Sequence, residues 1–271
     1  MERVKIEAAS RILELEYCWL GKENDDAPTV VFLHEGLGSI AMWRDFPARF
    51  CDESGVRGLV YSRSGYGKST PRPAGERFSP DYLHREAMEV LPKFLDILGV
   101  TRPFLFGHSD GGSIALLAAA GMPGRFPGIV VMAPHYFVEE ISLENIRVAR
   151  TAHEEHGLRE RLALYHDDVD SAFYGWNDVW LDLAFRDWNI EAELEKIDCP
   201  VLAIQGEDDE YASLEQICGI KRRVGHAELL VLSDCRHSPH RDRPEAVIAE
   251  TAAFLSRCTV PLKSGPAPRG N

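Results

Sequence analysis

The feature that most constrains the fold is a serine flanked by glycines, Gly-His-Ser-Asp-Gly at residues 107–111. The apolar run before it, 104–106, is typical of a buried strand, and the alanine- and leucine-rich run after it, 113–120, is typical of a helix. A strand can pass into a helix over so few residues only through a sharp, strained turn, which needs small residues two positions from the serine. Such a turn lifts the hydroxyl above the sheet at a helix N-terminus, where amides and dipole favour negative charge. The pattern predicts Ser109 as a candidate nucleophile; the alternative is a glycine-rich turn with an incidental serine.

The rest of the chain alternates strand-like and helix-like segments. Six short runs are apolar on both faces, as strands of a buried parallel sheet are: residues 30–33, 58–61, 104–106, 129–132, 201–204 and 229–232. Helical patterns occupy 80–98 (with Pro92 as a candidate bend), 111–121 and 243–257. Residues 11–19 alternate apolar and polar side chains, which predicts an antiparallel edge strand. The expected fold class is α/β, with a mostly parallel central sheet flanked by helices.

The alternation is interrupted between residues 137 and 196, where no strand-like run occurs. This stretch is charged, helical in character and aromatic, and it holds Trp176, Trp180 and Trp188. Because strand patterns resume after Pro200, we expect an inserted helical segment rather than a separate domain. The expected organisation is a core of residues 1–136 and 197–260, an insertion at 137–196, and a disordered, proline- and glycine-rich tail at 261–271.

A serine nucleophile needs a neighbouring base, and the base needs a carboxylate to orient it. We expect both at the carboxyl edge of the sheet, where parallel sheets place function. His237 lies in the loop after the run 229–232, with His240 as a competitor, whereas His226 precedes that run and belongs at the opposite edge.

Four carboxylates follow the run 201–204, at residues 207–210. Most of them are expected to form a solvated turn, and one is expected to orient the base. Asp209 is preferred over Asp208 on spacing alone, so the choice between the two stays open.

The loop after the run 30–33, His-Glu-Gly-Leu-Gly-Ser at residues 34–39, also follows a predicted strand. A main-chain amide from this loop, with the amide of the residue after the nucleophile, could hold the oxyanion of a tetrahedral intermediate. The first donor would be the N–H of Asp110, and the second an amide of this loop. The alternative is a turn that needs glycine for its conformation.

Composition excludes several other classes of function. The formal net charge of −13 argues against nucleic-acid binding, which relies on clustered lysine and arginine. No apolar run approaches the roughly 20 residues that span a bilayer, and residues 1–7 lack a secretory pattern, so a cytoplasmic location is expected. The six cysteines are scattered and expected to be reduced. The histidines of His-Glu-Glu-His at 153–156 are three apart, not the four a zinc motif needs, so no zinc site is expected there. Neither metal nor cofactor is expected, because a serine nucleophile with a histidine base needs none.

Together these residues resemble the α/β-hydrolase superfamily over residues 11–257. The motifs that carry the resemblance fall in the superfamily's order along the chain: 34–36, the glycine-rich turn 61–69, 107–112, 206–209, and His237 ahead of Pro244. The resemblance implies an α/β-hydrolase fold with a helical cap after the sixth strand. It further implies a triad of Ser109, Asp209 and His237, with the amides of Gly36 and Asp110 as the oxyanion hole.

Two residues depart from the superfamily's pattern. Glu35 stands where glycine is usual, which leaves Leu37 as the alternative to Gly36 for the loop donor. Asp110 follows the nucleophile where a neutral residue is commoner. Two carboxylates near a developing oxyanion would oppose it, so we expect Asp110 to face away from Ser109 and to offer only its N–H.

The expected function is hydrolysis of a small or medium apolar or aromatic carboxylic ester through an acyl-enzyme. The alternatives are cleavage of an amide, a lactone or a carbon–carbon bond on the same fold, or a non-catalytic homologue that only binds a ligand. The residues expected around the substrate are His34, Glu35, His108, Trp176 and Trp180. The expected partner is a small molecule, with no nucleic acid and no membrane, and the chain is expected to be a monomer or homodimer.

Overall fold

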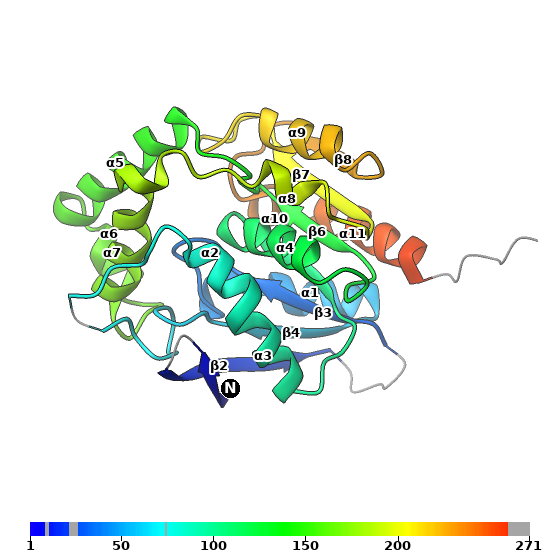
Figure 1. The fold of residues 1–271 in the computed structure, drawn as a ribbon, viewed down its shortest axis with the longest axis horizontal. Coiled ribbons are helices and arrows are strands. Elements are labelled where there is room, and N and C mark those ends of the chain that lie inside the picture. The colour runs from blue at the N-terminus through cyan, green and yellow to red at the C-terminus, as the bar shows by residue number, and fades with distance from the viewer. Residues whose placement is uncertain (9–10, 22–26, 74, 260–271) are drawn as a thin grey trace, which may run out of the picture.

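A computed structural model describes residues 1–8, 11–21, 27–73 and 75–259, so the tail predicted at 261–271 lies outside the described residues. Its centre is an eight-stranded sheet with the order β1-β2-β4-β3-β5-β6-β7-β8 (Figure 1). The strands are β1 (Glu2–Ala8), β2 (Arg11–Leu20), β3 (Thr29–Leu33), β4 (Arg57–Tyr61), β5 (Phe104–His108), β6 (Ile129–Met132), β7 (Val201–Gly206) and β8 (Glu228–Leu232). The six predicted apolar runs fall within β3 to β8, which pair in parallel, so the predicted fold class is confirmed.

The sheet begins with two antiparallel strands. β2 pairs with β1 on one side and β4 on the other, so the expectation that residues 11–19 form an edge strand is wrong. The edge is β1, in which Ile6 and Ala8 are buried and Val4 is half-buried. Four of the seven β1 residues are charged, so only three apolar side chains carry its alternating pattern in the sequence.

Helices cover both faces of the sheet. They are α1 (Phe46–Ser54), α2 (Tyr82–Arg85), α3 (Leu91–Ile97), α4 (Asp110–Gly121), α5 (Glu140–Glu155), α6 (Leu158–Leu162), α7 (Val169–Trp180), α8 (Glu191–Leu194), α9 (Glu215–Arg223), α10 (Pro239–Asp242) and α11 (Pro244–Thr259). Short turns of other helix types are η1 (Ala41–Trp43), η2 (Glu86–Val90) and η3 (Leu183–Phe185). None of the helices in the described part of the chain is both long and apolar enough to span a bilayer.

Alternate residues of the parallel strands enter two separate cores. Phe32 and Phe106 pack on one face with residues of α1 and α11, whereas Val31 and Leu105 pack on the other with residues of α3 and α4. Strands buried on both faces carry the continuous apolar runs seen in the sequence. This double burial holds the strand ends, and the loops that follow them, in fixed positions.

The helix predicted over residues 80–98 is built from three joined pieces, α2, η2 and α3. The middle piece is π-helical and ends just before Leu91 and Pro92, the first two residues of α3. Proline has no N–H to donate to the carbonyl four residues back, so the widened turn accommodates it. The irregular segment thus lies just before Pro92, the residue at which the sequence predicts a bend.

The residues between β6 and β7, all of which are described, form α5 to α8 and η3 rather than further strands of the sheet. The two ends of this segment meet: Phe137 and Asn189 form an isolated antiparallel bridge, and the N–H of Ile190 donates to the carbonyl of Tyr136 at 2.8 Å. Helices α5, α6 and α7 lie together to one side of the sheet, whereas α8 packs on α4 (Figure 1). Chain entry and exit are therefore close together at the sheet.

Candidate active site

Ser109 stands in the turn between β5 and α4. Its φ of 53° and ψ of −118° are a strained conformation for a residue other than glycine. The turn is so tight that a β-carbon at Gly107 would lie 2.6 Å from the amide nitrogen of Gly112. One at Gly111 would lie 2.8 Å from the carbonyl oxygen of His34. The requirement for small residues on both sides of the serine thus has a direct steric cause.

Ser109, His237 and Asp209 form one continuous chain of polar contacts. His237 Nε2 lies 3.0 Å from Ser109 Oγ, and His237 Nδ1 lies 2.8 Å from Asp209 Oδ1. The three residues follow β5, β8 and β7, so their loops all leave the carboxyl ends of parallel strands. A carboxylate on Nδ1 places the proton of the neutral ring there and leaves Nε2 free to accept the hydroxyl proton. This arrangement can activate a serine for attack on an electrophilic carbon.

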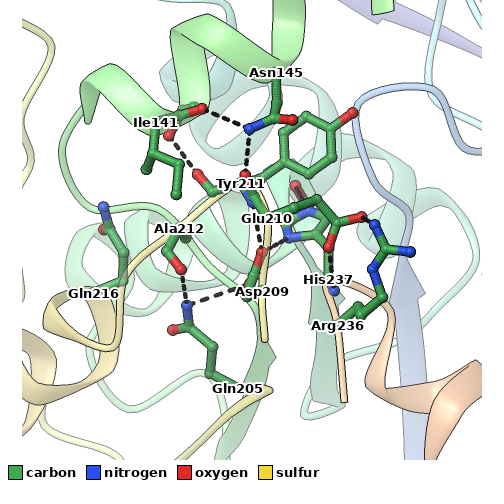
Figure 2. Close-up of polar contacts among 12 residues, drawn as sticks. Ile141, Asn145, Gln205, Asp209, Glu210, Tyr211, Ala212, Gln216, Arg236 and His237 are labelled. Atoms are coloured by element: carbon green, nitrogen blue, oxygen red, sulfur yellow. Dashed lines mark hydrogen bonds and ion pairs between the residues drawn. The ribbon is translucent and has the colours of Figure 1, made fainter. Parts of the chain in front are cut away.

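Asp209 is held by more than the histidine. Its Oδ1 also accepts from the N–H of Tyr211 at 2.9 Å, and its Oδ2 accepts from Gln205 Nε2 at 3.3 Å (Figure 2). Asp208, in contrast, is exposed, and its N–H donates to the carbonyl of Cys235. Of the two carboxylates that the sequence left open, the structure places Asp209 on the imidazole.

The surroundings of His237 favour its protonated form. Burial by itself lowers the pKa of His237, but the Asp209 carboxylate, with further contributions from Glu35 and Glu210, raises it above the ordinary histidine value. Burial likewise opposes ionisation of Asp209, yet the imidazole holds the pKa of that carboxyl below its usual range. A proton taken from Ser109 would therefore be stabilised on the ring.

Both candidate oxyanion donors lie beside Ser109. Gly36 lines the same cavity as Ser109, and Asp110 is the first residue of α4, where a main-chain N–H has no partner within its own helix. The indole of Trp176 covers Gly36, because a β-carbon built there would lie 3.0 Å from Cε2 of the indole and closer still to Cδ1 and Nε1. Glycine is therefore required at residue 36 for steric reasons.

The carboxylate of Asp110 is fully buried among three donors. It accepts from the Tyr82 hydroxyl at 2.8 Å and from Trp180 Nε1 at 3.3 Å, and Arg63 Nη2 lies 3.4 Å away. Burial raises the pKa of the Asp110 carboxyl, and Arg63, Tyr82 and Trp180 oppose that rise. These partners hold the carboxylate in the protein interior, the orientation expected if only its N–H serves the oxyanion.

A cavity of about 220 Å³ opens over Ser109 and His237. Its apolar wall comes from α5, α6 and α7, through Ile146, Ala149, Leu158, Leu162 and Trp176. Three of the residues predicted around the substrate, Glu35, Trp176 and Trp180, line this cavity.

The prediction that His34 and His108 line the substrate cavity is corrected, because the described lining includes neither ring. Both are buried at strand ends and bonded to main-chain atoms. His34 Nε2 accepts from the N–H of Arg63 at 2.9 Å. His108 Nε2 donates to the carbonyl of His237 at 2.7 Å, and burial lowers the pKa of His108 to about 4. The two histidines position loops of the site.

Glu35 lies at the cavity wall with its side chain 18% exposed. Its carboxylate is 3.3 Å from His108 Nδ1 and 3.8 Å from the Arg241 guanidinium. The partly exposed carboxylate is thus directed toward a cation outside the oxyanion loop.

Sequence reasoning missed several residues of the site. Arg63 and Tyr82 hold Asp110, Gln205 holds Asp209, and the rings of His135 and Tyr211 pack against His237 at 6.0 and 4.8 Å between centroids. Only Arg63 had a local signal, its place in the glycine-rich turn after β4.

No group of three or more histidine, cysteine, aspartate or glutamate side chains is arranged to hold a metal in the described part of the chain. In the 153–156 motif, the ring of His153 stacks on Phe173, with 3.7 Å between centroids. This histidine packs inside the helical segment.

The chain belongs to the alpha/beta hydrolase family, because the family model matches residues 30–250. It is 29% identical over 192 residues to Serine hydrolase BPHL of Homo sapiens, covering 67% of this chain and 63% of that protein, so the match spans less than two thirds of the relative's length. It is 25% identical over 259 residues to a proline iminopeptidase of Thermoplasma volcanium, covering 80% of this chain and 84% of that protein.

Solved structures show the same fold. A carboxylesterase structure from the thaumarchaeon Nitrososphaera gargenis superposes with a TM-score of 0.75 at 22% identity, covering 94% of this chain and 99% of that one. At this identity the similarity defines the architecture only.

Proposed function

We propose that the protein is a serine hydrolase that cleaves a small or medium apolar or aromatic carboxylic ester, with Ser109 as nucleophile. The observation that carries the proposal is the contact chain from Asp209 through His237 to Ser109 Oγ, at 2.8 and 3.0 Å, on the floor of a cavity. Membership of the alpha/beta hydrolase family supports a hydrolytic reaction.

In the first half of the reaction, Ser109 Oγ attacks the ester carbonyl carbon while His237 Nε2 takes the hydroxyl proton. The carbonyl π electrons move onto oxygen, and the amides of Gly36 and Asp110 stabilise the resulting oxyanion. When the carbonyl re-forms, the bond to the leaving alcohol breaks, and His237 gives that oxygen the proton. The products of this half are the free alcohol and an acyl group on Ser109.

In the second half, water attacks the acyl carbon and His237 takes a proton from it. The bond between the acyl carbon and Ser109 Oγ then breaks, and His237 returns the proton to the serine. The acid product leaves, and the enzyme is as it began. Asp209 stays ionised throughout and orients the imidazole.

The residues of the segment 137–196 act as a cap in this proposal. Helices α5, α6 and α7 supply the apolar wall of the cavity, and α7 contributes Trp176 and Trp180. An apolar acyl or aromatic group suits such a wall, because its burial there is favourable. The cavity volume of about 220 Å³ favours small and medium groups.

The test is hydrolysis of short activated esters, such as 4-nitrophenyl acetate and butyrate, by the wild type and Ser109→Ala. Ser113→Ala is the matched control, because that serine lies one turn further along α4 and its hydroxyl bonds only main-chain groups in the described contacts: the carbonyls of Ser109 and His135 and the N–H of His135. We expect the control to keep the wild-type rate and Ser109→Ala to lose it. A Ser109→Ala protein with the full rate would end the assignment. Parallel assays with an amide, a lactone and a vinylogous diketone then separate the bond types.

A further inference from the structure

Arg63 is a buried cation between the two loops that carry the candidate oxyanion donors. It follows β4 by two residues, and its side chain is 3% exposed. One nitrogen, Nη2, donates to the carbonyl of Glu35 at 2.9 Å and lies 3.4 Å from Asp110 Oδ2. A single guanidinium therefore touches the residue before Gly36 and the side chain of Asp110.

The contact with Glu35 fixes the direction of the Gly36 N–H. The carbonyl of Glu35 and the N–H of Gly36 belong to one trans peptide unit, in which the two groups point in opposite directions. Holding the carbonyl toward Arg63 therefore turns the N–H away from Arg63. Because Gly36 lines the cavity, this orientation leaves the donor available to a substrate oxygen.

Two further donors support the same carbonyl. The N–H of Gly38 donates to it at 3.0 Å. His34 Nε2 accepts from the N–H of Arg63, so the neutral ring carries its proton on Nδ1, which donates to the Glu35 carbonyl at 2.7 Å. Burial lowers the pKa of His34 well below its usual value, which keeps the ring neutral. Arg63 thus supports the Glu35–Gly36 peptide in two ways. Its side chain donates to the Glu35 carbonyl, and its main-chain N–H holds the His34 ring that donates to the same carbonyl.

The contact with Asp110 fixes the second donor. The carboxylate belongs to the first residue of α4, and it is anchored by Arg63 and Tyr82 at Oδ2 and by Trp180 at Oδ1. The N–H of this same residue is the other candidate oxyanion donor. Displacing its side chain would turn or shift the peptide that carries that N–H.

We propose that Arg63, paired with Asp110, is the positioning residue of the oxyanion hole and sets the directions of both donor N–H groups. This inference rests on the proposed function. Arg63 does not line the cavity with Ser109 among the described contacts, so it acts through Glu35, His34 and Asp110 rather than on the substrate. The proposal also explains the unusual acidic residue at position 110, since a neutral residue there would leave the Arg63 guanidinium less well paired.

Arginine is suited to this role because its planar guanidinium group donates to several acceptors in fixed directions. Lysine carries the same charge as a single point and cannot reproduce that geometry. The variant Arg63→Lys therefore keeps an ion pair with Asp110 but loosens the Glu35 peptide. The double variant Arg63→Gln/Asp110→Asn removes both charges of this pair together, and the neighbouring buried Glu86 keeps its hydrogen bond from Tyr61.

The experiment compares an oxygen ester with its thiono analogue, in which sulfur replaces the carbonyl oxygen. Sulfur is larger and a weaker hydrogen-bond acceptor, so an aligned oxyanion hole discriminates strongly against it. The readouts are kcat and KM for each ester and the ratio of the two kcat values. Tyr61→Phe is the control, because it removes a buried hydroxyl bond to Glu86 in the same region without touching either donor loop.

We expect Arg63→Lys to lower kcat for the oxygen ester about 100-fold with KM within threefold, because a small misplacement of catalytic groups has effects of that size. The thiono ester should lose much less, so the oxygen-to-sulfur ratio should shrink at least tenfold. Tyr61→Phe should keep the wild-type ratio. If Arg63→Lys fails to fold, the double variant carries the same comparison and should show the same reduced ratio.

An unchanged kcat in Arg63→Lys, or a loss that is equal for both esters, would overturn the inference, since a general disturbance of the fold would not discriminate between oxygen and sulfur. Failure of the proposed function would give different results in the same assays. In that case the wild type cleaves neither ester, or Ser109→Ala cleaves the oxygen ester as well as the wild type does, and the inference falls with it.

Discussion

Replacement of Gly36 by alanine tests the oxyanion loop through sterics alone. The added methyl would lie 3.0 Å from Trp176 Cε2 and nearer to two other indole atoms, well inside ordinary van der Waals contact. Trp176 is 7% exposed, so the tryptophan, the loop or both must move to make room for the methyl. The substitution should therefore displace the N–H of residue 36 from the position that faces the substrate.

The expected size of the effect follows from the loss of one donor. Removing one oxyanion-hole hydrogen bond lowers kcat by about 10²–10³-fold, equivalent to about 2.7–4 kcal/mol of transition-state stabilisation. KM should change little, because the interaction strengthens only as charge develops on the oxygen. Gly36→Ala should therefore retain at most about 1% of the wild-type kcat.

The assay is steady-state hydrolysis of a 4-nitrophenyl ester by Gly36→Ala, Gly225→Ala and Gly36→Ala/Trp176→Ala. Gly225 is the matched control, because an added β-carbon there meets nothing within 4 Å. Removing the indole in the double variant should restore part of the kcat that Gly36→Ala loses. A Gly36→Ala enzyme with kcat within threefold of wild type would refute the assignment of this loop as a donor.

Three further outcomes follow from the same site. Asp209→Asn should lower kcat about 10³–10⁴-fold, whereas Asp208→Asn, at an exposed residue, should keep a kcat near that of the wild type. Equal losses of kcat in a matched ester assay would contradict the choice of Asp209. The wild-type kcat/KM should fall as pH falls through the raised pKa of His237, because the imidazolium cannot accept a proton. In Asp209→Asn, any residual activity should show this acid-side fall at lower pH. If the pH–rate profiles of the two proteins fall at the same pH, the pairing of Asp209 with His237 is contradicted. Gly111→Ala should lower the free energy of unfolding in urea by about 1–3 kcal/mol or more, because its methyl would clash with the carbonyls of Leu33 and His34. An unchanged urea midpoint would show that the turn can relax.

The sequence predicts the parts of the fold whose signals are local. The serine turn is visible because its glycines, the strand before it and the helix after it lie within about twenty residues. The parallel strands are visible because burial on both faces makes them continuous apolar runs. β1 is not, since only Val4, Ile6 and Ala8 carry its alternating pattern, and four of its seven residues are charged.

A residue of the candidate site can be predicted from the sequence only where its loop directly follows a predicted strand. His237 could be chosen from ten histidines because its loop follows a predicted strand. Asp208 and Asp209 could not be separated, because one residue of spacing decides which carboxylate is buried and which is exposed. Arg63 and Gln205 act through contacts that only the folded chain creates. The pocket prediction for His108 failed because a polar residue at a strand end can equally bond the neighbouring main chain.

The most direct test of the central claim is covalent labelling of the folded protein with a fluorophosphonate, followed by peptide mass spectrometry. Activated Ser109 Oγ should attack phosphorus and expel fluoride, giving one label per chain on the peptide that contains residues 104–120. The wild type and Ser113→Ala should label fully, and Ser109→Ala and heat-unfolded protein should not. A folded wild type that stays unlabelled, or a Ser109→Ala protein that labels equally well, would contradict the proposal that Ser109 is the nucleophile.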